Sequence, residues 1–194
     1  MLTEIEPVEK FATAVAEQTW GVFRKDPLML VLASMVAGIV SVVTLGLLSP
    51  MVLVGLIDMV RKVQAGEPTK LADLFERFDA LLPGLIALVV VALAAAIGFA
   101  LLVVPGLLVL VFGAFPLHVI AFERSTSVDA IKGSIGLVKR NFLNVLVLLL
   151  GVSVLQAIGG AVVFGMLLSL PLSVVALTVA YQRLAHPGNV LSHG

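Results

Sequence analysis

The chain has no cysteine and few charged residues. Without cysteine there are no disulfides, no thiolate metal sites and no cysteine nucleophiles. Only 12% of its 194 residues are charged and the formal net charge is zero, whereas ordinary soluble domains carry about 25% charged residues. A neutral chain also lacks the basic excess that is typical of nucleic-acid binding, so we expect no nucleic-acid partner.

Motifs of known chemistry are missing as well. The sequence has no glycine-rich phosphate loop, no His-Glu-x-x-His and no Gly-x-Ser-x-Gly. These are the signatures of nucleotide sites, zinc proteases and serine hydrolases. We therefore predict no enzyme activity, no catalytic residue, no cofactor and no metal site.

Most of the sequence consists of long apolar runs. Hydrophobic residues make up 60% of the chain, and the mean hydropathy is +1.17. All charges lie in three short blocks and one late residue, Arg183, and the stretches 27–57, 80–122 and 141–182 carry none. Because no soluble core could bury this much apolar surface, lipid is the expected solvent for most of the chain.

The lengths of these runs predict helical hairpins, since one transmembrane helix needs about 20 apolar residues. The stretches 80–122 and 141–182 each fit two helices, while 27–57 must continue towards Lys62. A turn before Pro50 is predicted, with Ser49 as helix N-cap and Pro50 as the first helical residue. The predicted fold class is all-α: one membrane domain (1–194) of about six transmembrane helices, with hairpins at 27–62, 80–122 and 141–184 and a flexible tail at 185–194.

Hairpins return the chain to the side that it left. All twelve Lys and Arg residues then lie on one side of the membrane. Short loops rich in Lys and Arg stay in the cytoplasm, so we expect both termini there.

An amphipathic segment precedes each hairpin, at 1–26, 66–79 and 126–140, which indicates a threefold repeat. In the second segment, Leu71, Leu74, Phe75 and Phe78 recur at the spacing of one helical face. Such helices suit a membrane surface, where cations meet anionic headgroups. The plainer alternative is that they only brace the hairpins. The expected lipid-contacting residues are Trp20, Arg24, Lys25, Arg61, Lys62, Lys139 and Arg140.

Asp58 is the first candidate for an intramembrane polar site, because ionisable groups are costly in lipid. It follows Pro50 by about 12 Å along a helix, which would place it inside the bilayer. Alternatively, a locally thin bilayer leaves Asp58 at the cytoplasmic interface beside Arg61.

His118 and Gln156 are the other two candidates. No second His or carboxylate accompanies His118 in its apolar stretch, so an interface role is favoured over a proton relay. Gln156, together with Ser153, is expected to hydrogen-bond a neighbouring helix. Two prolines are expected to shape the fourth membrane helix: Pro105 at its start, and Pro116 inside it as a kink.

Six short motifs, at 55–58, 66–68, 73–75, 104–107, 115–116 and 137–141, resemble those of the YciC-type six-helix membrane proteins of bacteria. They are also similar to the membrane domain that precedes some glycerophosphodiester phosphodiesterases. The resemblance implies a six-helix fold in the bacterial cytoplasmic (inner) membrane and carries over no activity. The motifs are Gly55-Leu56-Ile57-Asp58, Gly66-Glu67-Pro68, Asp73-Leu74-Phe75, Val104-Pro105-Gly106-Leu107, Phe115-Pro116 and Leu137-Val138-Lys139-Arg140-Asn141.

Two functions remain open at this point. The first is a non-enzymatic membrane protein that acts through lipid, through a membrane protein partner or as a homo-oligomer. The second is a small transporter or channel for an apolar or amphiphilic solute. A cavity that reaches the membrane midplane and is lined by Asp58, His118 or Gln156 would favour the second.

Overall fold

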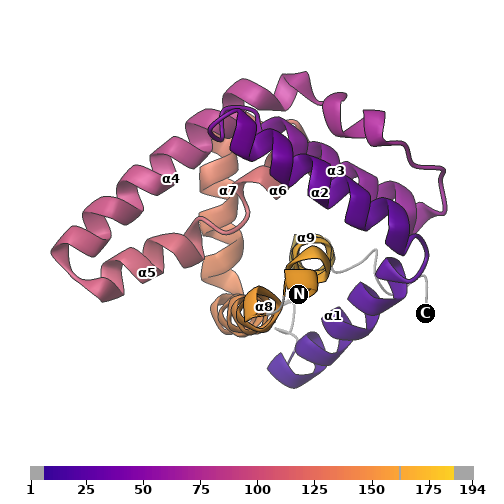
Figure 1. The fold of residues 1–194 in the computed structure, drawn as a ribbon. Coiled ribbons are helices and arrows are strands. Elements are labelled where there is room, and N and C mark those ends of the chain that lie inside the picture. Colours follow the sequence, from indigo (N-terminus) through magenta and orange to yellow (C-terminus); the bar gives the residue numbers. More distant parts are fainter. Residues whose placement is uncertain (1–6, 162, 186–194) are drawn as a thin grey trace.

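The computed structural model describes residues 7–161 and 163–185, and within them the chain is helical, with no strand. The all-α prediction is confirmed for this part of the chain. The helices, shown in Figure 1, are α1 (Val8–Phe23), α2 (Pro27–Val43), α3 (Ser49–Ala65), α4 (Leu81–Leu101), α5 (Val103–Phe112), α6 (Pro116–Glu123), α7 (Ser127–Arg140), α8 (Phe142–Ala161) and α9 (Val163–Ala185), and two 3-10 turns, η1 (Leu71–Phe75) and η2 (Phe78–Ala80), precede α4.

Four helical segments are long and apolar enough to cross a membrane. The α1–α2 pair, bent by 95°, would make a fifth if it counted as one span. The prediction of several apolar spans is thus confirmed, while the layout of six spans stays a prediction because α2 and α3 have only 17 residues each. The four segments are Leu71–Leu101, Val103–Glu123, Phe142–Gly160 and Leu168–Ala185.

The first hairpin forms where it was predicted, from α2 and α3. Leu45 (φ 51°) and Gly46 (φ 82°) adopt the left-handed conformation in the turn between them. The N-cap of α3 is Leu48 and Ser49 is its first residue, so the predicted cap at Ser49 was wrong by one position.

Segment 66–79 differs from the predicted amphipathic helix. It is extended up to Lys70 and then forms η1 and η2. Leu74 is fully buried, but Leu71 and Phe78 are exposed, so the four apolar residues do not share one buried face. The backbone N–H of Lys70 donates to the Asp73 carboxylate (3.1 Å), and this local bond favours the tight turn over a regular helix.

The second hairpin is α4 against a broken partner. A single residue, Leu102, separates α4 from α5, and Pro105 lies in the first turn of α5, as predicted. Pro116 was predicted to kink a continuous helix. Instead α5 ends at Phe112 and Pro116 begins α6, because proline is accepted in a first helical turn but not in a helix interior.

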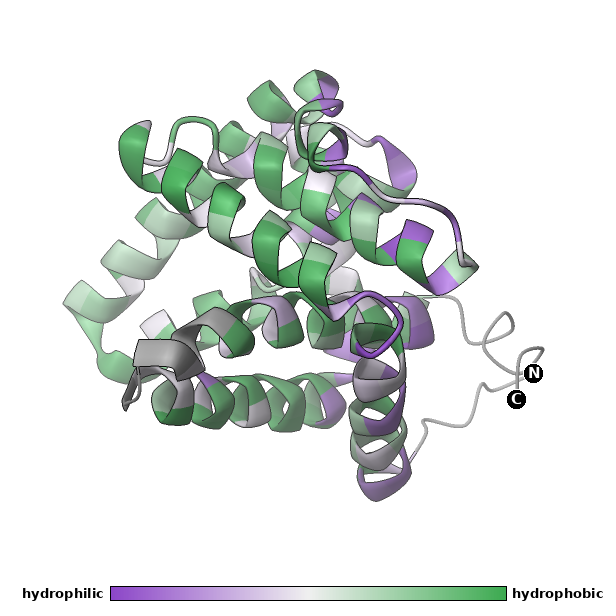
Figure 2. Ribbon diagram, turned by 45° about the vertical axis from the view of Figure 1, so that its right-hand side comes forward, coloured by the Kyte–Doolittle hydropathy of each residue, from purple (hydrophilic) through white to green (hydrophobic). Residues whose placement is uncertain are grey.

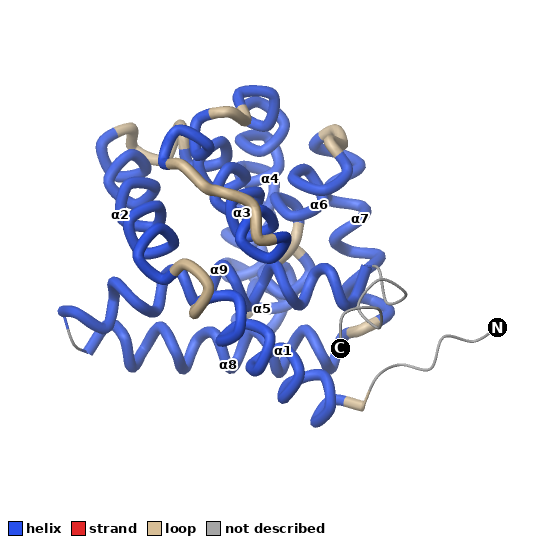
Figure 3. The backbone as a smooth tube through the Cα atoms, turned by 90° about the vertical axis from the view of Figure 1, so that its right-hand side faces the viewer, coloured by secondary structure: helices blue, strands red, loops and turns tan. Residues whose placement is uncertain are grey.

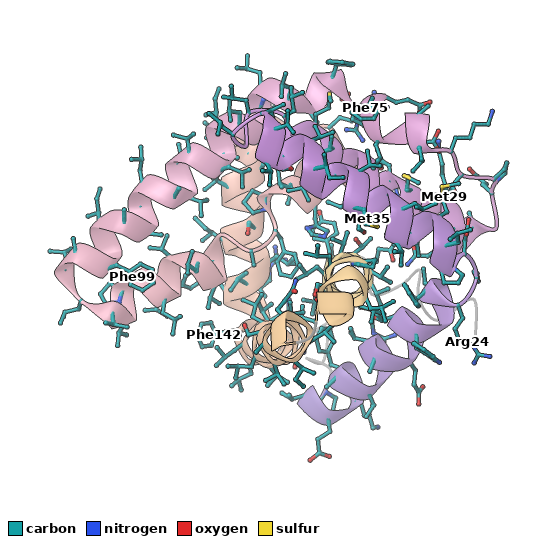
Figure 4. The ribbon with its side chains drawn as sticks, in the orientation of Figure 1. Arg24, Met29, Met35, Phe75, Phe99 and Phe142 are labelled. Carbon is teal, nitrogen blue, oxygen red and sulfur yellow. The ribbon has the colours of Figure 1, made fainter. Side chains whose placement is uncertain are left out.

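The tip of this hairpin is a close approach of two helices. A Cβ built on Gly98 of α4 would lie 2.8 Å from the Cα of Gly106 in α5. The Phe99 ring covers Gly106 from the α4 side, and Figure 4 shows it at this tip. Glycine at both positions therefore lets the two backbones meet.

The third hairpin is formed by α8 and α9, and α9 occupies the middle of the bundle (Figure 1). Helix α9 contacts α1, α2, α3 and α8. Its residues Val175, Val179 and Tyr181 are almost fully buried and belong to the main core. The predicted flexible tail at 185–194 lies outside the described residues except for Ala185, the last residue of α9.

Polar and apolar ends separate across the molecule. Figure 2 shows hydrophilic ribbon gathered on the right-hand side, while the α4–α5 tip and most of the apolar ribbon lie towards the left. Helix α1 lies at 95° to α2, and Figure 3 shows it extending along the edge of the bundle beside α8. The charged blocks are thus gathered at one end, called the charged end from here on.

Candidate functional site

Arg77 is the centre of the charged end. Its side chain is only 7% exposed, although arginine is almost never buried unless it is paired. The guanidinium donates to the carboxylates of Asp79 (3.0 Å) and Asp58, and to the main-chain oxygens of Ile120 and Ala121 (3.3 Å each). Both oxygens lie near the C-terminal end of α6, and the Ile120 oxygen also accepts from the Arg124 N–H (3.0 Å). Arg77 therefore joins α3, η2 and α6.

Asp58 lies at the edge of this network, with its side chain 20% exposed. It accepts from Arg77 and from Arg61 (3.0 Å). The Arg61 guanidinium also lies 4.3 Å from the centre of the Phe122 ring, a cation–π geometry. The pairing of Asp58 with Arg61 corresponds to the interface alternative for Asp58.

Lys62 forms a second group of ion pairs on α3. Its ammonium lies 3.0 Å from the carboxylate of Asp73 and 3.7 Å from that of Glu76. The hydrogen bond to Asp73 raises the pKa of Lys62, against the smaller effect of burial. Lys62 therefore stays charged and fixes η1 to α3.

A cleft of about 830 Å³ opens between these groups. Both signs of charge line it, including Asp58, Lys62, Glu76, Glu123 and Arg124. Opposite charges lie next to each other, so the cleft presents no single-sign surface to a ligand. The ion pairs of the cleft connect neighbouring elements of the fold.

Further polar contacts join α9 and the α1–α2 loop to the charged end. The amides of Gln64 and Gln182 exchange two hydrogen bonds (3.0 and 2.8 Å). The Tyr181 hydroxyl donates to the Glu123 carboxylate (3.1 Å), and the Lys25 ammonium donates to the Gln64 carbonyl (2.9 Å). Lys25 of the first charged block thus contacts Gln64 of the second block, and α9 contacts both Gln64 and Glu123 of the third block.

His118 lies away from this cleft, among aromatic rings. It is 5% exposed, and its ring centre lies 5.6 Å from that of Phe115 and 5.7 Å from that of Tyr181. Neither of its ring nitrogens has a hydrogen-bond partner among the described residues. His118 is therefore a core residue of the helical bundle, and its predicted position at the membrane interface stays a prediction.

Gln156 makes the interhelical contact that was expected of it. Its side-chain oxygen accepts from the Ser169 hydroxyl of α9 (3.0 Å). Ser153 does not join it, since the Ser153 hydroxyl donates to Leu149 in its own helix (2.7 Å). Asp58, His118 and Gln156 therefore occupy three different settings: a charged cleft, an aromatic core and a helix–helix contact.

The break before Pro116 is closed by a residue of α7. Ser134 is fully buried, its hydroxyl donates to the Phe112 carbonyl (2.6 Å), and its oxygen accepts from the Phe115 N–H (3.2 Å). These are backbone groups freed where α5 ends and α6 begins, and buried groups of this kind need partners. Ser134 thus fixes α7 to the broken helix.

Helix α7 is the most basic helix of the charged end. Thr126 caps it by accepting from the Asp129 N–H (3.3 Å). Ala130, Ser134, Leu137 and Val138 are buried against its neighbours. The exposed side carries its three cations, Lys132, Lys139 and Arg140, and a single acid, Asp129. An amphipathic helix is confirmed here for the third charged block.

Of the other predicted lipid-contacting residues, some are exposed and some form ion pairs within the chain. Trp20 is 54% exposed, and Arg24 extends from the end of α1 (Figure 4). Arg61 and Lys62, in contrast, form ion pairs with carboxylates of the chain. Less of their charge is therefore available to a headgroup.

Two apolar grooves lie beneath the amphipathic helices. One, of about 370 Å³, lies between α1, α8 and α9 and is lined by Phe11, Trp20 and Leu148 among others. The other, of about 270 Å³, lies between α4, α5 and α7, and Lys139 is the one charged residue that lines it. A groove with apolar walls and one cation suits an anionic amphiphile.

Sequence reasoning missed Arg77 and Ser134. Arg77 stands in a charged segment that reads as exposed, and nothing local indicates its partners on α6. Ser134 could have been suspected from its place on the apolar side of 126–140, where a small hydroxyl can satisfy a neighbouring backbone.

The fold is a bundle of apolar helices with one charged end. Residues 78–192 match the model of a family described as a domain of unknown function, DUF7847. The chain belongs to this family. No curated protein and no solved structure matches it, and the resemblance to YciC-type proteins stays a prediction.

Proposed function

We propose that the protein is a multi-pass protein of the bacterial cytoplasmic membrane that acts without catalysing a reaction, by binding anionic lipid headgroups at its charged end. The proposal places both ends of the chain in the cytoplasm. A protein partner or a second copy remains compatible with it, since lipid binding and assembly are not exclusive.

The composition of α7 is the observation that carries this proposal. Three exposed cations against one acid leave a basic surface, and the opposite side of the helix is buried against α4, α5, α6 and α8. A basic amphipathic helix at a bilayer surface gains about 1 kcal/mol per Lys or Arg from anionic lipid. The charged cleft offers no such surface, because its charges pair with one another.

The transporter hypothesis receives less support. It requires Asp58, His118 or Gln156 to line a solute path, but these side chains lie in three separate settings, and His118 is sealed among rings. Buried polar residues of a transport path usually face one cavity. We therefore favour lipid binding.

The first prediction concerns stability in defined lipid. Phosphatidylglycerol added to the detergent-solubilised protein should raise the unfolding midpoint by roughly 5–10 °C relative to phosphatidylcholine, since binding to the native state stabilises it. The difference should shrink in 1 M salt, which screens exposed charges. Circular dichroism during heating measures both effects.

Charge-matched variants of α7 complete this test. Replacing Lys132, Lys139 and Arg140 together by glutamine should abolish the difference between the two lipids. The variant in which the same positions carry Arg, Arg and Lys should keep it. Equal midpoints of the unmodified protein in both lipids would contradict the proposed function.

The second prediction concerns topology, and the lack of cysteine makes it easy to test. Single cysteines at Leu45 and Leu102, both exposed at apolar turns, should react with an impermeant maleimide on the periplasmic side only. Single cysteines at Glu67 and Lys132, both exposed at the charged end, should react in inside-out vesicles only. Labelling of both sets from the same side would contradict this arrangement.

A further inference from the structure

We infer that the groove between α4, α5 and α7 is a specific site for one anionic phospholipid, with an acyl chain in the groove and the phosphate at Lys139. The inference rests on the proposed function and names the place on the protein where a single lipid is selected. It concerns a bound lipid, as distinct from the changing lipids around any membrane protein.

The walls of the groove come from three helices. Val90, Val91 and Ala94 of α4 line one side, Val109 and Phe112 of α5 and the following Gly113 line the second, and α7 closes the third. The volume of about 270 Å³ is several times the ~30 Å³ that a water molecule takes up in the liquid. Its walls are apolar apart from Lys139, so a flexible hydrocarbon segment is a favourable occupant.

Gly113 keeps the groove at its present width. A Cβ on Gly113 would lie 2.5 Å from one methyl carbon of Val91 and 3.1 Å from the Val109 carbonyl oxygen. This glycine follows α5 directly, at the break that Ser134 closes. The broken span therefore shapes one end of the groove.

Lys139 supplies the charge. Ile131, Ile135 and Lys139 follow one another at four-residue spacing on α7, and all three line the groove. This face of the helix is therefore apolar at Ile131 and Ile135 and positively charged at Lys139. Lys139 is exposed and has no ion pair with a carboxylate in the described parts of the chain. Its long aliphatic stem can follow the apolar wall while the ammonium meets a phosphate.

Charge complementarity separates this groove from the one under α1. The α1 groove is larger, about 370 Å³, but no Lys or Arg lines it. It can take a hydrocarbon chain without preference for a headgroup. Of these two grooves, the α4–α5–α7 groove has a cation at its apolar wall, and this combination selects an anionic amphiphile.

Native mass spectrometry of the delipidated protein tests the inference. Titration with phosphatidylglycerol should give one lipid that binds more tightly than the rest, and more tightly than phosphatidylcholine. Lys139→Gln should weaken this first site about fivefold and leave phosphatidylcholine binding unchanged. Lys10→Gln, at an exposed cation of α1 that belongs neither to the groove nor to α7, should leave the first site unchanged.

A matched pair of variants tests the hydrocarbon part of the site. Ala94→Phe should fill the groove and remove the first site for both lipids, whereas Ala92→Phe, at an exposed position of α4, should keep it. Each variant is first checked for an unchanged unfolding midpoint. If Ala94→Phe fails this check, the comparison of Lys139→Gln with Lys10→Gln decides alone.

The outcomes separate the two proposals. If the unmodified protein prefers phosphatidylglycerol but Lys139→Gln binds it as tightly, the specific site is wrong and lipid binding by the charged end stands. If the unmodified protein shows no preference between the lipids, both fail. Tight binding of a free fatty acid in place of the phospholipid would also overturn the site as stated.

Discussion

Replacing Arg77 by methionine should lower the free energy of unfolding by about 2–3 kcal/mol, since it removes several hydrogen bonds between a buried guanidinium and its partners, and a bond to a charged group contributes about 1.5–3 kcal/mol. The variant leaves Asp58 and Asp79 without this cation, and the main-chain oxygens of Ile120 and Ala121 without this donor. Methionine fills similar space, so loss of charge and hydrogen bonds dominates the effect. Thermal or denaturant unfolding in detergent, followed by circular dichroism, measures it.

Arg61→Met is the matched control for Arg77→Met. Arg61 also pairs with Asp58, but its side chain is 43% exposed, and exposed ion pairs contribute about 0–1 kcal/mol. The double variant Arg77→Met/Asp58→Leu should recover part of the loss, because Asp58, which would keep only its exposed partner Arg61, is removed with the cation. If Arg77→Met lowers the free energy of unfolding no more than Arg61→Met does, Arg77 does not hold α3, η2 and α6 together.

The helical hairpins were predictable because apolar length and breaks are local properties of the sequence. The turn before Pro50 and the start of the fourth helix at Pro105 were found from proline and glycine alone. The grouping of the charged blocks at one end likewise follows from hairpin geometry. No partner elsewhere in the chain is needed for these inferences.

The joints between hairpins were not predictable, since they depend on long-range partners. Segment 66–79 has helical spacing of apolar residues, but Lys70 and Asp73 form a local turn and Arg77 meets α6. The break before Pro116 was expected as a kink because the partner that makes it tolerable, Ser134, lies on α7. The aromatic surroundings of His118 were not predictable for the same reason, because the rings around it come in part from α9.

Gly55→Ala is the second substitution for which we expect a large loss, about 1–3 kcal/mol, as overpacking of a tight contact costs. A Cβ on Gly55 of α3 would lie 2.8 Å from both the Cα and the carbonyl carbon of Leu74, and closer still to its carbonyl oxygen. These are backbone atoms, which cannot rotate away as a side chain can. Leu74 is fully buried beside Leu56 and Met59, so η1 itself must move.

The sign of this effect is informative, because alanine is otherwise the better helix former. In a helix interior, Gly→Ala stabilises by about 0.8–1.0 kcal/mol. Gly38→Ala in α2 is the control, since no atom lies within 4 Å of its added Cβ, and it should be neutral or stabilising. Movement of η1 should also carry Arg77 away from α6, so Gly55→Ala combined with Arg77→Met should cost less than the sum of the two. Strict additivity, or a stabilising Gly55→Ala, would show that η1 is not seated on α3 through this glycine.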